Sequence, residues 1–189
     1  LEVLREPLES GEIVIARARD KVRFPARFQL VAAMNPCPCG YLGDPSGRCR
    51  CSAEQIQRYR SKLSGPLLDR IDLHLHVARE ATALHANPDS ASSSAQAAAT
   101  VAAARQRQEQ RQGGANAFLD LQQLRQHCGL SDDDQHWLES ACERLGLSLR
   151  AAHRLLKVAR TLADLDAVDA IQRSHLAEAL QYRSSSPTA

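Results

Sequence analysis

The sequence FQLVAAMN, residues 28–35, decides how the first part of this 189-residue chain is interpreted. It is an almost unbroken apolar run followed by Pro36, and such a run is typical of a strand buried on both faces, as in a parallel sheet covered by helices. Residues 71–77, IDLHLHV, alternate between apolar and polar side chains and predict a second strand. We therefore expect residues 1–80 to be a fragment of an α/β domain.

A β-hairpin is predicted just before this run. Residues 1–10 have the spacing of a helix end, with Gly11 as its C-terminal stop. The sequence EIVIARARDKVRF at 12–24 predicts two antiparallel strands with a turn near Arg19 and Asp20. The tip therefore carries three basic side chains, Arg17, Arg19 and Lys21. Such charges usually serve solubility, so the sequence alone assigns them no partner.

Four cysteines follow within fifteen residues and form the pattern C-x-C-x9-C-x-C: Cys37, Cys39, Cys49 and Cys51. In a chain without a visible export signal, such a cluster indicates a metal site before it indicates disulfides. Four thiolates can close a tetrahedral Zn²⁺ site, which has no open position and is therefore structural. The alternatives are reduced cysteines, two disulfides or an iron–sulfur cluster, because a one-residue gap is not the usual C-x2-C spacing.

The residues after the cysteines predict a helix and then a linker. Ser52 is a plausible N-cap for a helix that extends to about Leu63. Residues 81–115 are predicted to hold a linker and a connecting helix. The Ala-, Arg- and Gln-rich part from Ala95 to Gln112 has good helix propensity, and a disordered tether is its alternative.

Residues 116–184 predict an all-α bundle, and residues 185–189 a disordered tail. The pattern favours one helix over 118–127 and then three capped helices. Their expected N-caps are Ser131, Ser148 and Ser174. Cys128 and Cys142 lie at helical core spacing and are expected to be ordinary hydrophobic side chains.

Composition limits the function only weakly. The formal net charge is +2, which is too balanced to indicate nucleic acid, so any basic surface must be local. The sequence has neither an apolar run long enough to span a membrane nor a secretory leader, and we expect a cytoplasmic protein. The first residue is Leu1, which fits a piece of a longer chain.

Three polar residues are candidates for chemistry. Asn35 ends the predicted buried strand, and ligands in open α/β sheets bind beyond such ends. Arg70 lies between two aspartates, where a structural ion pair is the common role. Arg150 lies in the first turn of a helix, where a cation is unfavourable to the dipole and an anion could explain it. For each of them position alone also allows an ordinary structural role.

Two further groups have weaker claims. His74 and His76 are expected on one face of a strand, where packing or surface roles are more common than metal binding. A second basic stripe lies near the end of the connecting helix, at Arg105, Arg107 and Arg111.

Three blocks in order, FPARFQLVAAMNPCPCG, SGPLLDRIDLHLHV and LSLRAAHRLLKVARTLADL, resemble the ComM/YifB family of magnesium-chelatase-like AAA+ ATPases. The resemblance covers almost the whole chain. It implies the later part of an AAA+ αβα core with a β-hairpin insertion and a Cys-rich loop, followed by an all-α helical lid. The family works as a hexameric ring with ATP and Mg²⁺ as cofactors.

The resemblance also implies roles for the three polar residues. Asn35 matches sensor 1, which polarises the attacking water beside the γ-phosphate. Arg70 matches the arginine finger, which reaches the neighbouring subunit's nucleotide. Arg150 matches sensor 2, a lid residue that touches the γ-phosphate. Hairpins inserted before the sensor-1 strand point into the pore of the ring, so the basic tip is expected to contact DNA phosphates.

The sequence holds no GxxxxGK[ST] loop and no strand that ends in Asp-Glu to hold Mg²⁺. The family has both before the matched segment, so these residues alone are expected to be inactive. The full protein is expected to be a DNA-acting motor with helicase or branch-migration activity in natural transformation. One alternative is a magnesium-chelatase-like subunit that remodels a protein partner without DNA. A zinc-stabilised interaction module is the third possibility.

Overall fold

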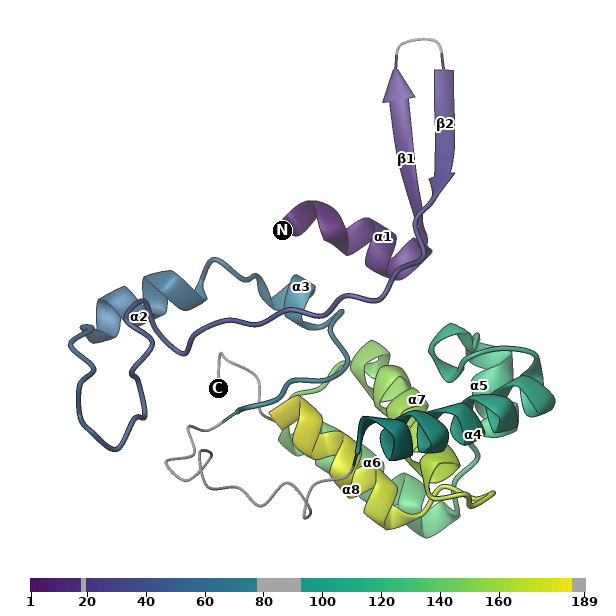
Figure 1. The fold of residues 1–189 in the computed structure, drawn as a ribbon. Helices are drawn as coiled ribbons and strands as arrows, with labels where there is room; N and C mark the ends of the chain where they lie inside the picture. The colour runs from purple at the N-terminus through teal and green to yellow at the C-terminus, as the bar shows by residue number, and fades with distance from the viewer. Residues whose placement is uncertain (18–19, 78–92, 185–189) are drawn as a thin grey trace. The chain divides into compact units, whose positions relative to one another are not determined.

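A computed structural model describes residues 1–17, 20–77 and 93–184 of the chain (Figure 1). It divides into two compact units, Leu1–His74 and Leu75–Ser185. Most of the predicted linker, the hairpin residue Arg19 and the predicted tail lie outside the described residues. Each unit is described by itself below.

The N-terminal unit begins with the predicted helix end and hairpin. The 3-10 helix η1, Glu2–Leu4, leads into α1, Arg5–Ser10, and Gly11 ends α1 in the left-handed conformation with φ of 69°. Strands β1, Glu12–Arg17, and β2, Asp20–Pro25, pair in antiparallel register. This confirms the hairpin that alternation of β-branched side chains predicted.

The two strands predicted over 28–35 and 71–77 are not formed. In the described part of the chain the only sheet is the β1–β2 hairpin, and both segments have no regular secondary structure. Val31 is 84% exposed and Leu75 is 70% exposed. A strand exists only when a neighbour accepts its backbone hydrogen bonds, so an apolar run without a neighbouring strand stays extended but unpaired.

Two short helices complete the N-terminal unit. Helix α2, Ala53–Arg60, begins at the predicted cap, where the Ser52 side chain accepts from the Gln55 N–H and the Gln55 side chain accepts from the Ser52 N–H. This reciprocal pair satisfies two backbone donors that a helix start leaves open. Helix α3, Gly65–Leu68, has a simpler cap, in which the Ser64 side chain accepts from the Leu67 N–H.

All the regular secondary structure described in the C-terminal unit is helical. It contains α4, Ser94–Gln112; η4, Asn116–Phe118; α5, Leu121–His127; α6, Asp132–Arg144; α7, Leu149–Leu165; and α8, Arg173–Ser184. The connecting segment is therefore a helix, α4, and not a disordered tether. The predicted caps Ser131 and Ser148 are confirmed, since each side chain accepts a backbone N–H three residues later.

Two helix starts differ from the sequence prediction. The single helix predicted over 118–127 begins only at Leu121, because Asp120 forms a reciprocal cap with Gln123 and η4 precedes it. Helix α8 begins one residue before Ser174, so Ser174 is not its cap. The His175 ring performs part of that function, since its Nδ1 accepts from the Gln172 N–H at 3.0 Å.

Helix α7 lies at the centre of the bundle and packs against α4, α5 and α8 (Figure 1). Its apolar face buries Leu155, Ala159 and Ala163 almost completely. Cys128 and Cys142 are buried in the same core, as predicted.

A buried ion network joins α4 to α7. Both terminal nitrogens of Arg111 donate to the Asp164 carboxylate, at 2.6 and 2.9 Å, and Arg160 lies 3.1 Å from the same group. The Asn116 amide donates to Asp164 at 2.8 Å. Burial raises the pKa of Asp164, but these donors and the two guanidinium charges outweigh it, so the pKa lies below its usual value. Asp164 therefore stays ionised inside the unit.

We expect Asp164→Asn to destabilise the C-terminal unit by about 3 kcal/mol, because the buried Arg160 and the partly buried Arg111 lose their counter-charge. Trp137, the single tryptophan, packs against this core and reports its unfolding in urea by fluorescence. Because the folded pKa of Asp164 is depressed, this stabilisation is present at neutral pH and is lost only as the pH falls through the folded pKa.

The matched control is Asp169→Asn, whose side chain is fully exposed 4.0 Å from Arg107. It removes the same charge, but solvent screens the exposed pair, so the unfolding midpoint should stay close to that of the unaltered protein. Equal unfolding midpoints for the two variants would show that the network does not hold the bundle together.

Candidate metal centre and neighbouring polar residues

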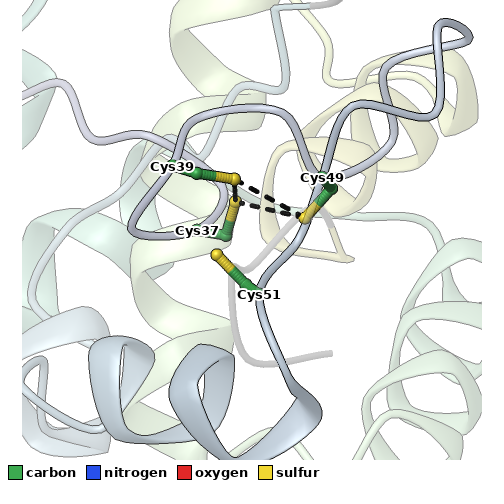
Figure 2. A group of neighbouring side chains, drawn as sticks. All are labelled: Cys37, Cys39, Cys49 and Cys51. Atoms are coloured by element: carbon green, nitrogen blue, oxygen red, sulfur yellow. Dashed lines mark hydrogen bonds between the residues drawn. The ribbon is translucent and has the colours of Figure 1, made fainter.

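The four clustered cysteines meet in space (Figure 2). All four sulfur atoms lie within 4.8 Å of one another, and Figure 2 shows their side chains converging from two segments of the loop. The Sγ of Cys37 lies 3.3 Å from that of Cys39 and 3.8 Å from that of Cys49, and the Cys39 and Cys49 sulfurs are 3.7 Å apart. Each Cys-x-Cys segment therefore offers two ligand atoms to one point.

Local sequence explains this convergence. Gly40 has φ of 80°, and its N–H donates to the Cys37 carbonyl at 3.0 Å, which closes a tight turn around the first pair. Asp44 closes the far end of the loop by accepting from the Ser46 N–H at 2.8 Å. Cys51 directly precedes the cap of α2, so the second pair is continuous with that helix.

The thiols differ strongly in acidity. Hydrogen bonds from the Tyr41 backbone and then from Cys37 and Cys51 lower the pKa of Cys39 to about 6. The hydrogen bond to Cys39 is the main cause that raises the pKa of Cys51 to about 12. One thiolate is therefore favoured here, while further ionisation is opposed by the first charge. A cation among the sulfurs would remove that opposition, because thiolates are the metal-binding form.

The geometry fits a metal ion better than disulfides. Zinc–sulfur bonds of about 2.3 Å in a tetrahedron place the sulfurs about 3.8 Å apart, close to the distances observed. A disulfide needs about 2.05 Å, and all six cysteines are free thiols in the structure. The four cysteines Cys37, Cys39, Cys49 and Cys51 could therefore hold one ion in a closed site.

Asn35 lies beside this loop. Its side chain is exposed, and a Cβ atom added at Gly40 would lie 3.7 Å from the Asn35 amide carbon. The turn at Gly40 therefore packs close to the Asn35 side-chain amide. The predicted position at the end of a formed strand is wrong for the described residues, but the residue does lie directly before the cysteine cluster.

The partners of Arg70 include Glu9 and Pro66. Its guanidinium forms an ion pair with Glu9 of α1 and donates to the Pro66 carbonyl at 2.6 Å. The Arg70 side chain is only 15% exposed. The sequence expectation of an ion pair with a neighbouring aspartate missed Glu9, which lies 61 residues away along the chain.

Arg150 belongs to the other unit. It is exposed in the first turn of α7, two residues after the Ser148 cap, as predicted. The first turn of α7 holds no acidic residue. The N-terminus of α7 therefore presents a guanidinium together with the positive end of the helix dipole, an arrangement suited to an anion.

The described part of the hairpin tip is exposed. Arg17 pairs with Asp20 and Lys21 with Ala16 in the strand register, and Arg19 lies outside the described residues. The second predicted basic stripe is partly wrong. Arg111 is not a surface cation, because Asp164 occupies two of its donors.

His74 and His76 lie where packing and surface side chains were expected. His74 is buried, and its Nε2 lies 3.2 Å from the Ile71 carbonyl and 3.3 Å from the Leu68 carbonyl. His76 is exposed. Within the described residues, no helix is long and apolar enough to cross a membrane.

Two sequence families match the chain: magnesium chelatase, subunit ChlI, over residues 1–84, and magnesium chelatase, subunit ChlI C-terminal, over residues 91–183. The chain is 50% identical over 185 residues to competence protein ComM of Haemophilus influenzae and 50% identical over 187 residues to protein YifB of Escherichia coli. It is 41% identical over 186 residues to protein Mb2921c of Mycobacterium bovis.

Each alignment covers 97% of this chain but only 36% or 37% of the relative. The chain thus spans about a third of the length of these curated relatives. The two family matches define a protein of the magnesium chelatase type. Within that class, the chain belongs to the ComM/YifB family of AAA+ ATPases, which confirms the resemblance found in its sequence.

We expect the purified protein to carry one metal ion per chain, because the four sulfur atoms lie within 4.8 Å of one another. Elemental analysis without added metal measures this directly. Cys49→Ser should lose the ion, since a closed site tolerates no missing ligand. Cys128→Ala removes a cysteine of the helical core and should retain the ion. Less than about 0.2 equivalents in the unaltered protein would contradict the site.

Proposed function

We propose that the full-length protein is an ATP-hydrolysing AAA+ motor that works as a ring, with Asn35, Arg70 and Arg150 at the nucleotide. Family membership supports the ATPase class. The observation that carries the assignment of roles is the placement of Arg70, a largely buried guanidinium whose orientation is fixed by Glu9 and Pro66. An oriented guanidinium suits a developing phosphate charge, because it stays charged and binds oxygen atoms in a fork.

The three residues contribute in different ways. Asn35 orients the attacking water beside the γ-phosphate. Arg70 stabilises the transition-state charge on the nucleotide of the neighbouring subunit, and Arg150 contacts the γ-phosphate from the helical lid. Phosphoryl transfer depends on such positioning and charge stabilisation more than on covalent chemistry. Because Arg70 acts in trans, subunits must contact head to tail, and such contacts close into a ring.

The cysteine site holds a structural zinc ion in this proposal. Zinc fits four thiolates and needs no open position, and the reducing cytoplasm keeps the thiols available. The ion contributes rigidity to the loop beside Asn35. No step of ATP hydrolysis passes through it, because a closed tetrahedral site cannot bind a reactant.

The proposed substrate is DNA, moved in natural transformation by helicase or branch-migration activity. Its support is the likeness to the competence protein ComM together with the exposed basic hairpin. Remodelling of a protein partner without DNA is the second candidate, since the matched families are named for a magnesium chelatase subunit. The two candidate functions differ in whether the basic side chains of the hairpin are needed to bind the substrate.

In the full-length protein, Arg70→Ala should lower the ATP turnover number by at least about 10³-fold, the scale of a lost arginine finger. Nucleotide affinity should change little, because the finger serves the neighbouring site. Steady-state phosphate release and equilibrium binding of a labelled nucleotide separate the two effects. Mixing with Asn35→Ala subunits should restore part of the activity. In some interfaces of a mixed ring, one subunit then supplies an intact Asn35 and its neighbour an intact Arg70.

Glu9→Gln is the matched control for the orientation of Arg70. It keeps a hydrogen-bond acceptor but loses the charge that holds the guanidinium. Its turnover should fall less than that of Arg70→Ala, and it should have no further effect when Arg70 is already alanine. Normal turnover in Arg70→Ala would rule out the finger.

Replacing Arg17, Arg19 and Lys21 with alanine in the full-length protein should weaken DNA binding. The slope of log K against log salt should flatten by up to about 0.7 to 0.9 per lost phosphate contact. Such contacts do not depend on base sequence. Basal ATPase should persist, while its stimulation by DNA should decrease.

Arg23→Ala serves as the control on the stem of the same hairpin, where Arg23 lies 3.7 Å from Glu12. It removes a cation but leaves the tip intact, so DNA affinity should stay close to the unaltered value. If the triple variant keeps both affinity and salt slope, the hairpin does not contact DNA, and protein remodelling becomes the better explanation.

A further inference from the structure

A local concentration of positive charge lies beside the cysteine cluster, in addition to the one at the hairpin. Residues 48–62 hold five basic side chains and one acidic side chain, hence a formal charge of +4 on a chain whose total is +2. The five are Arg48, Arg50, Arg58, Arg60 and Lys62. They flank the second cysteine pair and continue along α2.

Helix α2 has no packed core to explain its composition. None of its residues is buried, and Ile56 and Tyr59 are only half-buried. Its charges are also weakly neutralised within the helix. The acid of the stretch, Glu54, pairs with Arg58 at 3.0 Å, and both side chains are about four-fifths exposed. A pair this exposed contributes little stability and can rearrange for a ligand.

A hollow of about 590 Å³ lies between α2 and the cysteine loop. Arg58 and Tyr59 line it from α2, and Lys62 lines it from the turn that follows the helix. Cys39 and Cys51 line it from the loop, with Pro38 and Gln55 completing the wall. The Lys62 ammonium lies 5.9 Å from the centre of the Tyr59 ring. The hollow thus combines two cations with an aromatic ring.

A metal ion bound by the four cysteines would not neutralise all the positive charge of residues 48–62. A divalent ion with four thiolates carries a net charge of −2, which offsets two of the formal positive charges and leaves a surplus. Cys37, the most buried of the ligands, also lies away from solvent. Arg48 has a separate arrangement, 4.5 Å from the Tyr41 ring centre and 3.8 Å from Asp44. The cations that face the hollow are therefore available to a ligand.

We propose that this hollow binds the sugar–phosphate backbone of a single DNA strand. Arg58 and Lys62 contact phosphates, and Tyr59 packs against a base or sugar. Single-strand sites commonly pair a basic groove with aromatic platforms, which accept any base. An acidic peptide would use the cations but leave the ring without a planar partner. The identity of the strand rests on the proposed function, whereas the site is separate from the hairpin.

The test uses the full-length protein with Mg²⁺ and a non-hydrolysable ATP analogue. Binding of a fluorescein-labelled oligo-dT strand is followed by anisotropy over a salt series. The Arg58→Gln, Lys62→Gln double variant should bind about tenfold more weakly near 0.1 M salt, and its salt slope should flatten by up to about 1.4. A strand that carries 4-thiothymidine should crosslink to the peptide that contains Tyr59.

The matched control is the Arg125→Gln, Arg144→Gln double variant, which removes two exposed arginines from α5 and α6 of the C-terminal unit. Its affinity and salt slope should stay unchanged. Metal content of the α2 variant must equal that of the unaltered protein, which shows that the loop is intact.

Three results would overturn the proposal. The α2 variant could bind like the unaltered protein while the hairpin variant loses affinity, which would leave the proposed DNA function standing. Polyglutamate could compete as well as DNA and with the same salt slope, which would assign the hollow to an acidic protein. Finally, absence of DNA binding by the unaltered protein would remove the proposed DNA function as well.

Discussion

The convergence of four sulfur atoms is the constraint on which the N-terminal unit depends. Its described residues bury few hydrophobic side chains: Cys37, Leu67, Leu68 and, near the start, Pro7. Two long apolar segments remain exposed because no neighbouring strand covers them. The cysteine loop is one of the places in this unit where separate segments meet, and the Arg70–Glu9 pair is another. A metal ion bound in the cysteine loop would fix the turn beside Asn35 and the start of α2.

The C-terminal unit is stabilised by different means. Its helices bury a continuous apolar core around α7, and the Asp164 carboxylate joins α4 to α7 through Arg111 and Arg160. Such a buried charge is costly unless each partner is present, so the network favours one arrangement of the helices. The helical bundle that carries Arg150 can therefore keep its shape, whereas the N-terminal unit leaves apolar segments exposed.

Local signals in the sequence predicted local structure well. Ser52, Ser131 and Ser148 begin helices because their side chains cap the chain within three residues, and the cysteine pattern predicted the sulfur cluster. The strand predicted at 28–35 is not formed, because pairing depends on neighbouring strands that the segment's own sequence does not supply. The pairs Arg111–Asp164 and Arg70–Glu9 join residues 53 and 61 positions apart, and no spacing rule reaches that far. The His175 contact at the start of α8 was missed because Ser174 is the commoner cap.

Arg70 links the structure to the proposed reaction, since Glu9 and Pro66 orient the group that would act on a neighbour's nucleotide. The direct measurement is an electron cryomicroscopy structure of the full-length protein with Mg²⁺ and a non-hydrolysable ATP analogue. The predicted result is a ring in which the Arg70 guanidinium lies about 3 Å from the terminal phosphate bound by the adjacent subunit. An assembly in which Arg70 faces no nucleotide in any subunit would contradict it.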